Sequence, residues 1–181
     1  IGEIELKNVS LFYPETQIKA LNDVSIKISP GTTVGIIGNI GSGKSSILDL
    51  ICRLYDPSEG SITLDGVDLK EYTLDQIRES IGYVPQNAFL FSESIENNIR
   101  FGSQKVDLER IKDVSKKAVV HDNIISFAKG YETLLGERGV TLSGGQIQRI
   151  SIARALIKDS KILLLDDCLS AVDTDTEEEI L

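Results

Sequence analysis

The fold is decided by Gly38-Asn39-Ile40-Gly41-Ser42-Gly43-Lys44-Ser45-Ser46. This stretch fits the pattern G-x-x-x-x-G-K-[ST], in which a glycine-rich loop wraps around phosphate oxygens. The apolar, β-rich residues 33–37 precede it, and residues 47–54 are typical of a helix. Glycines let a backbone approach phosphate closely, and a helix N-terminus adds unpaired N–H groups. The stretch therefore predicts a phosphate-binding loop between a strand and a helix, rather than a turn that happens to contain a lysine.

Two side chains of this loop and one distant carboxylate carry the expected chemistry. Lys44 would hold the β- and γ-phosphates of a nucleotide, and Ser45 would supply a hydroxyl to Mg²⁺. The apolar run at 162–165 predicts a buried central strand that ends in Asp166. Ligands bind at this end of parallel sheets, where a carboxylate suits Mg²⁺. The alternative is that Asp166 caps a helix.

Composition sets the class of protein that the sequence can encode. A length of 181 residues with 41% hydrophobic residues predicts one soluble, globular domain. The net charge of −9 argues against broad nucleic-acid binding. No apolar run approaches the roughly 18 residues of a membrane span, and no secretory leader is recognisable. Cys52 and Cys168 lack metal-ligand spacing and predict thiols in a reducing cytosol. Methionine is absent even at position 1, so we expect a piece of a longer chain.

The secondary structure that the sequence predicts changes along the chain, from mainly strands to mainly helices. Alternating or β-rich residues predict strands at 4–11, 21–28, 61–66 and 81–86, the third ending in an Asp-Gly turn and the fourth at a proline. Between residues 91 and 154 polar, helix-forming segments dominate, at 94–100, 107–119 and from 146 onward. A mostly helical insertion is expected there.

A second glycine pair lies in Leu142-Ser143-Gly144-Gly145-Gln146, before an apolar-striped segment at 147–157. Ser143 is a plausible N-cap, and two glycines at a helix start expose N–H groups to an anion. A second phosphate site is useful if it closes over a nucleotide held by another copy or partner. On the residues alone, a plain glycine-rich helix cap is the simpler interpretation.

Five segments of the chain, taken in their order along the sequence, resemble the motifs of the nucleotide-binding domain of an ABC transporter. They are similar to its Walker A, Q-loop, signature, Walker B and D-loop, at 38–46, Gln86, 142–146, 162–167 and Ser170-Ala171-Val172-Asp173. The resemblance covers nearly the whole chain. Three further segments resemble the exporter branch, namely Phe12-Tyr13-Pro14, Ser94-Ile95-Glu96-Asn97-Asn98-Ile99 and Leu135-Gly136-Glu137-Arg138-Gly139.

The resemblance implies an α/β fold of the P-loop NTPase type. Its RecA-like core with a mainly parallel sheet would carry an N-terminal antiparallel β-subdomain and an α-helical insertion. We expect the β-subdomain at 1–30 and about 60–80, the ATP-binding core at about 31–56, 81–86 and 158–181, and the helical subdomain at about 87–157. The family's switch histidine would follow Leu181, since the only histidine is His121, expected at the surface. Weak or no ATPase activity is therefore expected of the chain alone.

The resemblance also implies a role for each site residue. Tyr13 would stack on adenine, and residues 38–46 would hold the phosphates. Asp166, Ser45 and Gln86 would serve Mg²⁺, with Gln86 also near the attacking water. In a dimer, the γ-phosphate of ATP bound by the opposite subunit would be contacted by Ser143, Gly144, Gly145 and Gln146. Asp173 would also act at the dimer interface. Glu137 would contact the transmembrane helices. The alternatives are ordinary structural roles: a strand aromatic for Tyr13, loop residues for Gln86 and Glu137, and a helix cap for Asp173.

Asp167 departs from the family pattern, because a glutamate usually follows the Walker B aspartate as the catalytic base. Aspartate is one CH₂ group shorter, so its carboxylate would lie about 1 Å further back, a misplacement that can cost roughly 100-fold in rate. The alternative is a backbone shift that preserves hydrolysis. The resemblance therefore implies a weakly hydrolytic site in one half of a heterodimeric exporter.

The function expected from these features is that of an exporter ATPase. Its cofactors would be ATP and Mg²⁺, and its partners a second nucleotide-binding domain and a transmembrane domain, at the cytoplasmic face of the membrane. No nucleic-acid partner is expected. A soluble ABC protein acting on ribosomes or DNA is the alternative, disfavoured by the acidic balance and by the exporter-like segments at 94–99 and 135–139. A metabolite kinase would not explain residues 142–146.

Overall fold

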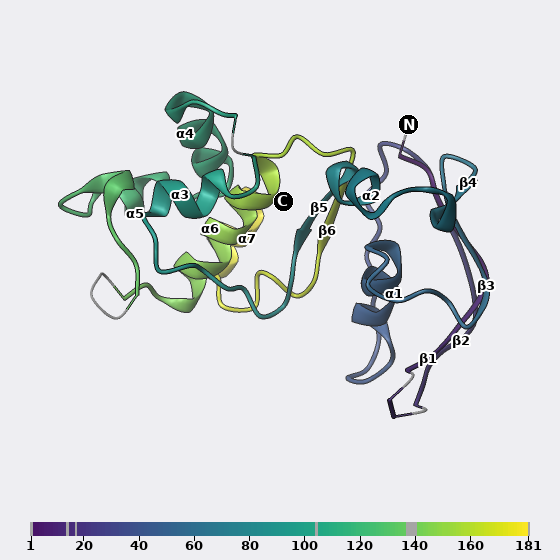
Figure 1. Ribbon diagram of the computed structural model, residues 1–181. Coiled ribbons are helices and arrows are strands. Elements are labelled where there is room, and N and C mark those ends of the chain that lie inside the picture. Colours follow the sequence, from purple (N-terminus) through teal and green to yellow (C-terminus); the bar gives the residue numbers. More distant parts are fainter. Residues whose placement is uncertain (1, 14, 17, 104, 137–140, 181) are drawn as a thin grey trace. The chain divides into compact units, whose positions relative to one another are not determined.

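The computed structural model describes residues 2–180 except 14, 17, 104 and 137–140. The chain divides into two compact units, Ile1–Ile81 and Gly82–Leu181, here called the N-terminal and C-terminal units. The elements of both are labelled in Figure 1. The finer division into a β-subdomain, an ATP-binding core and a helical subdomain stays a prediction.

The N-terminal unit is built on a four-stranded antiparallel sheet in the order β2-β1-β3-β4. The strands are β1 (Ile4–Phe12), β2 (Lys19–Ile28), β3 (Glu59–Leu64) and β4 (Val67–Asp68). Asp65 and Gly66 join β3 to β4 with φ values of 53° and 80°. Two positive φ angles make the tight hairpin turn that Asp-Gly favours. The predicted strands at 4–11, 21–28 and 61–66 are confirmed.

Helix α1 (Lys44–Ile51) follows the glycine-rich loop and packs its apolar side inward, burying Ile47, Leu48, Leu50 and Ile51. The predicted helix is therefore present, although it begins and ends about three residues earlier than expected. The short turn Leu69–Glu71 and helix α2 (Leu74–Ser80) complete the unit. Thr73 and Gln76 form a capping box at the start of α2.

The strand predicted at 33–37 is wrong for this structure, because residues 32–40 form an irregular segment. Val34 and Ile37 are 48% and 98% exposed, as no packed strand would leave them. A strand exists only where a neighbouring strand pairs with its backbone. Within the N-terminal unit the four sheet strands pair among themselves, and this segment stays outside their ladder.

The C-terminal unit contains the parallel pair β5 (Ile81–Val84) and β6 (Ile162–Leu165). Pro85 follows β5, as expected for a residue that cannot donate to a ladder. β6 buries Ile162 and Leu164 but leaves Leu163 43% exposed. The expectation of a strand buried on both faces is therefore wrong here, because β6 has β5 as its only paired neighbour in the described part of this unit.

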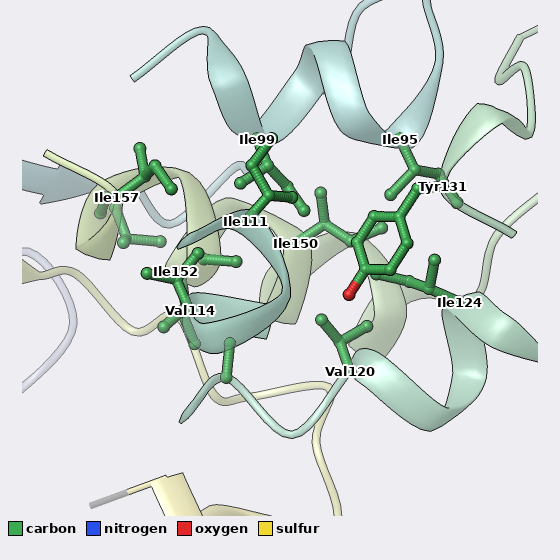
Figure 2. Packing of buried hydrophobic residues seen from close by; sticks show 14 of the residues in the cluster. Ile95, Ile99, Ile111, Val114, Val120, Ile124, Tyr131, Ile150, Ile152 and Ile157 are labelled. Carbon is green, nitrogen blue, oxygen red and sulfur yellow. The ribbon is translucent and has the colours of Figure 1, made fainter. Parts of the chain in front are cut away.

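The remaining chain is helical, as predicted for the insertion. The helices are α3 (Ile95–Arg100), α4 (Leu108–Lys117), α5 (His121–Ile125), α6 (Gly144–Leu156) and α7 (Thr174–Ile180), with the turn Gly130–Glu132 after α5. α6 packs against α3 and α4. Figure 2 shows the core of this unit, which consists mainly of isoleucine and valine side chains and the ring of Tyr131. Among the described residues, no helix has the length and apolar character needed to cross a bilayer.

The sequence predicts His121 at the surface, but the structure shows that its side chain is half-buried. Its Nδ1 lies 2.8 Å from the hydroxyl oxygen of Tyr131. The chain turns back after α5 and brings Tyr131 over the first residue of that helix, so the imidazole gains a partner that the sequence pattern does not reveal.

Candidate nucleotide-binding site

The glycine-rich loop ends in a left-handed N-cap for α1. Gly43 caps the helix with φ 90° and ψ 14°, a left-handed conformation that residues with a side chain avoid. A Cβ on Gly43 would lie 2.5 Å from the Ala20 carbonyl oxygen and 2.8 Å from Leu21 Cδ2. Only glycine lets the loop lie this close to β2. The first N–H groups of α1 consequently face out of the helix at its N-terminus, where an anion is favoured.

Lys44 bends back over the loop that precedes it. Its Nζ donates hydrogen bonds to the carbonyl oxygens of Gly38 and Asn39, at 2.9 and 3.0 Å. Because these acceptors are neutral, they hold the ammonium in place without cancelling its charge. Lys44 and the start of α1 therefore present a positive charge and N–H donors together, which fits a polyphosphate.

Tyr13 lies beside the same helix, one residue past the end of β1. Its hydroxyl oxygen is 2.8 Å from Oγ of the buried Ser46. Its ring meets Tyr55 edge to face, with centroids 5.1 Å apart and an angle of 84° between the planes. The structure thus brings Tyr13 to Ser46, the last residue of the stretch 38–46, while its contact with adenine stays a prediction.

A second group of site residues lies at one edge of the β5–β6 pair. Gln86 comes two residues after β5, and Asp166 and Asp167 come directly after β6. The N–H of Asp166 donates to the Val84 carbonyl at 3.0 Å, which extends the pairing of the strands. Nε2 of Gln86 donates to Oδ2 of Asp167 at 3.0 Å. Both residues predicted to be catalytic are therefore in direct contact.

The residues after β6 differ in their exposure. Asp167 is exposed and adopts φ 46°, in the left-handed region, whereas Cys168 is only 2% exposed. Burial raises the pKa of the Cys168 thiol to about 11. The thiol is therefore a packed, protonated group in the core of this unit. Both cysteines keep the thiol form that the sequence predicts.

The signature segment opens α6. Ser143 is the N-cap, its Oγ accepting from the Gln146 N–H at 3.2 Å, while Gln146 Oε1 accepts from the Ser143 N–H at 2.9 Å. Ser143 is thus confirmed as a cap, and the Gln146 side chain is engaged in the same capping box. Gly144 and Gly145 form the first helical turn. The proposed contact of these residues with a nucleotide stays a prediction.

Asp173 caps the next helix, because its Oδ1 accepts a hydrogen bond from the Thr176 N–H at 3.0 Å. This bond lowers the pKa of the Asp173 carboxyl. The helix-cap alternative is therefore confirmed for the side chain, and a role across a dimer interface remains a prediction. Glu137, predicted to contact transmembrane helices, lies outside the described residues.

Gln148 is a buried residue of this region that the sequence reasoning missed. Its carboxamide joins α6 to Ser170 and Ala171, at 3.1 and 3.0 Å. A glutamine on the buried face of an apolar-striped helix is the one signal that could have revealed it. No group of three His, Cys, Asp or Glu side chains able to hold a metal ion occurs in the described ranges.

Comparison with known proteins agrees with this geometry. The family model described as "ABC transporter" matches residues 21–170. An uncharacterised ABC transporter ATP-binding protein of Bacillus subtilis is 48% identical over 99% of this chain and 31% of its own length. The ATP-dependent lipid A-core flippase of Salmonella typhimurium is 45% identical over the same shares.

A solved structure of a bacterial Atm1-family ABC exporter with ATP bound superimposes with a TM-score of 0.93, at 38% identity, over 99% of this chain and 31% of that chain. The chain thus spans about a third of the length of these relatives. Their names favour the exporter branch over soluble ABC proteins. The matched family, the fold and the ordered motifs agree: this chain belongs to the ABC transporter family.

Proposed function

We propose that this chain is the nucleotide-binding domain of an ABC exporter, which binds and hydrolyses ATP to drive outward transport of a solute. The observation that carries the proposal is the position of Lys44, whose ammonium is held over the glycine-rich loop at the N-terminus of α1. The domain would act at the cytoplasmic face of a membrane, joined to transmembrane helices and paired with a second nucleotide-binding domain.

The residues divide the work as follows. Tyr13 stacks on adenine, and residues 38–46 hold the phosphates through backbone N–H groups and Lys44. Ser45, Asp166 and Gln86 offer the oxygen ligands that Mg²⁺ prefers. When bound, the metal would supply charge stabilisation at the phosphates. Ser143, Gly144, Gly145 and Gln146 reach the nucleotide of the second domain, and Asp173 lies at the interface between the two.

Asp167 makes the chain's own site weakly hydrolytic in this proposal. Its carboxylate is shorter than the usual glutamate and already accepts a hydrogen bond from Gln86. A base in this position stands further from an attacking water, which slows hydrolysis while leaving the phosphate loop unchanged. Such a site suits one half of a heterodimeric exporter, in which the intact signature completes the partner's faster site.

Binding of ATP to the chain tests the proposal. Lys44→Ala removes the only charged contact that the loop itself offers, so it should weaken binding of Mg-ATP by about 10- to 100-fold, as expected for a charge-assisted hydrogen bond. Lys70→Ala, a change of an exposed lysine in the same unit, is the matched control and should bind as the wild type does. Isothermal titration calorimetry measures both. Equal affinity for all three proteins would refute the proposal.

A further inference from the structure

Gln148 occupies the second turn of α6, and its side chain is 7% exposed. Its Nε2 donates to Ser170 Oγ at 3.1 Å, and its Oε1 accepts from the Ala171 N–H at 3.0 Å. A backbone N–H can only donate, so Ala171 determines which end of the carboxamide faces it. One side chain therefore joins the signature helix to the segment after β6 with both of its polar atoms in use.

The hydrogen bonds continue from Ser170 to the predicted catalytic pair. Ser170 Oγ donates to the Asp167 carbonyl oxygen at 3.0 Å, and the Asp167 carboxylate accepts from Gln86. Asp167 holds φ 46°, a conformation that costs energy for a residue with a Cβ and persists only where its surroundings enforce it. The bond from Ser170 is one of those constraints. A chain of hydrogen bonds thus runs from Gln148 through Ser170 and Asp167 to Gln86.

The signature end of α6 touches the same segment. A Cβ on Gly145 would lie 2.7 Å from the Ala171 carbonyl oxygen. The backbones of residues 145 and 171 can therefore approach this closely only because residue 145 is glycine. Ala171 is therefore held from two sides, by Gly145 at the start of α6 and by Gln148 one turn later. Movement of the signature relative to Asp167 would break these contacts.

We propose that Gln148 is a positioning residue, which keeps the signature end of α6 and the carboxylate of Asp167 in a fixed relation. This inference rests on the proposed function, in which Asp167 serves the chain's own nucleotide and the signature serves that of the second domain. Gln148 acts through Ser170 and Ala171 and needs no contact with ATP. It couples the two sites to which the chain contributes.

Turnover of the assembled transporter separates positioning from binding. In Gln148→Glu the carboxylate still accepts from Ala171, but it cannot donate to Ser170, whose hydroxyl then turns from Asp167 toward the new acceptor. At the chain's own site, with the partner's site silenced, we expect kcat to fall about 10-fold, since small misplacements of catalytic groups are costly, with the KM for ATP unchanged. Ser170→Ala should give the same loss, and the double variant no further loss, because both act in one network.

The matched control is Ser151→Ala. Ser151 lies on the same helix, is 4% exposed, and its hydroxyl finds no hydrogen-bond partner among the described residues. Its kcat and KM should equal those of the wild type. Wild-type kcat in Gln148→Glu, or a rise in KM that accounts for the loss, would overturn the proposal.

Amide hydrogen exchange of the chain without nucleotide tests the contact independently of turnover. Exchange at Ala171 should accelerate at least 10-fold in Gln148→Ala and stay slow in Gln148→Glu, which keeps the acceptor. Unchanged exchange in Gln148→Ala would overturn the proposal even if that variant is inactive. If exchange behaves as expected but the wild-type chain binds Mg-ATP no more tightly than its Lys44→Ala variant, the proposed function fails and the Gln148 contact stands.

Discussion

At the scale of single residues, one CH₂ group at position 167 separates a weakly hydrolytic site, with aspartate, from a fully hydrolytic site, with the usual glutamate. The carboxylate of Asp167 is held by Gln86 Nε2 at 3.0 Å, and its backbone is held by Ser170. The residue is therefore ordered by its neighbours. If its weakness as a base comes from reach alone, lengthening the side chain should restore hydrolysis without other changes.

We expect Asp167→Glu to raise hydrolysis at the chain's own site by about 10- to 100-fold, because the carboxylate advances by about 1 Å toward the water. Single-turnover hydrolysis in the assembled transporter, with the partner's site silenced, measures this rate. Asp159→Glu is the matched control, since Asp159 is exposed in the same unit and also has a positive φ, of 53°. An unchanged rate in Asp167→Glu would show that the backbone already compensates for the shorter side chain.

At the scale of elements, α2 and α6 begin with the same device but differ in expected function. Thr73 and Gln76 cap α2, and Ser143 and Gln146 cap α6, each pair forming two reciprocal hydrogen bonds. The distances match closely: the N-cap side chain accepts at 3.2 Å in both boxes. Stability and signature function can therefore be separated by comparing the two helices.

We expect Thr73→Ala and Ser143→Ala each to lower the free energy of unfolding by about 1 kcal/mol, the usual cost of losing an N-cap side chain. Only Ser143→Ala should also reduce ATP turnover in the assembled transporter, by about 10-fold, because Ser143 alone is proposed to meet a γ-phosphate. Urea unfolding and steady-state turnover measure the two effects. Equal turnover in both variants would reduce Ser143 to a helix cap.

At the scale of the whole molecule, local sequence patterns predicted the elements well and missed long-range contacts. Strands β1 to β3 and the helices α3, α4 and α6 follow from periodicity and caps, and the Asp65-Gly66 hairpin from its turn chemistry. The expected strand at 33–37 failed because pairing partners, which no local pattern contains, decide whether an extended segment is a strand. Local patterns also do not reveal the role of Gln148, since its hydrogen-bond partners lie 22 and 23 residues further along the chain.

Gln86 contacts Asp167 at the end of β6 because adjacent parallel strands deliver their C-terminal residues to one edge. The family motifs assign both residues to catalysis, and that role stays a prediction. They also place the phosphate loop and the signature on one chain, where the proposed function uses them in two different nucleotide sites. This arrangement makes a head-to-tail pairing of domains testable by mixing variants.

Lys44→Ala disables the phosphate loop and keeps the signature. Gly144→Asp keeps the phosphate loop and disables the signature, because its negative charge repels a γ-phosphate. The helix should tolerate the change, since an acidic residue is favourable in the first helical turn. A Cβ at position 144 would lie 3.4 Å from the Ala171 Cβ, which is an ordinary contact. In a transporter built from two copies of the chain that both carry Asp167→Glu, each variant alone should lack ATP turnover. Mixed in equal amounts they should recover about a quarter of the rate of the Asp167→Glu transporter, because half of the dimers are mixed and each has one complete site. Recovery at zero would mean that loop and signature of the same copy form the site, which a head-to-tail dimer forbids.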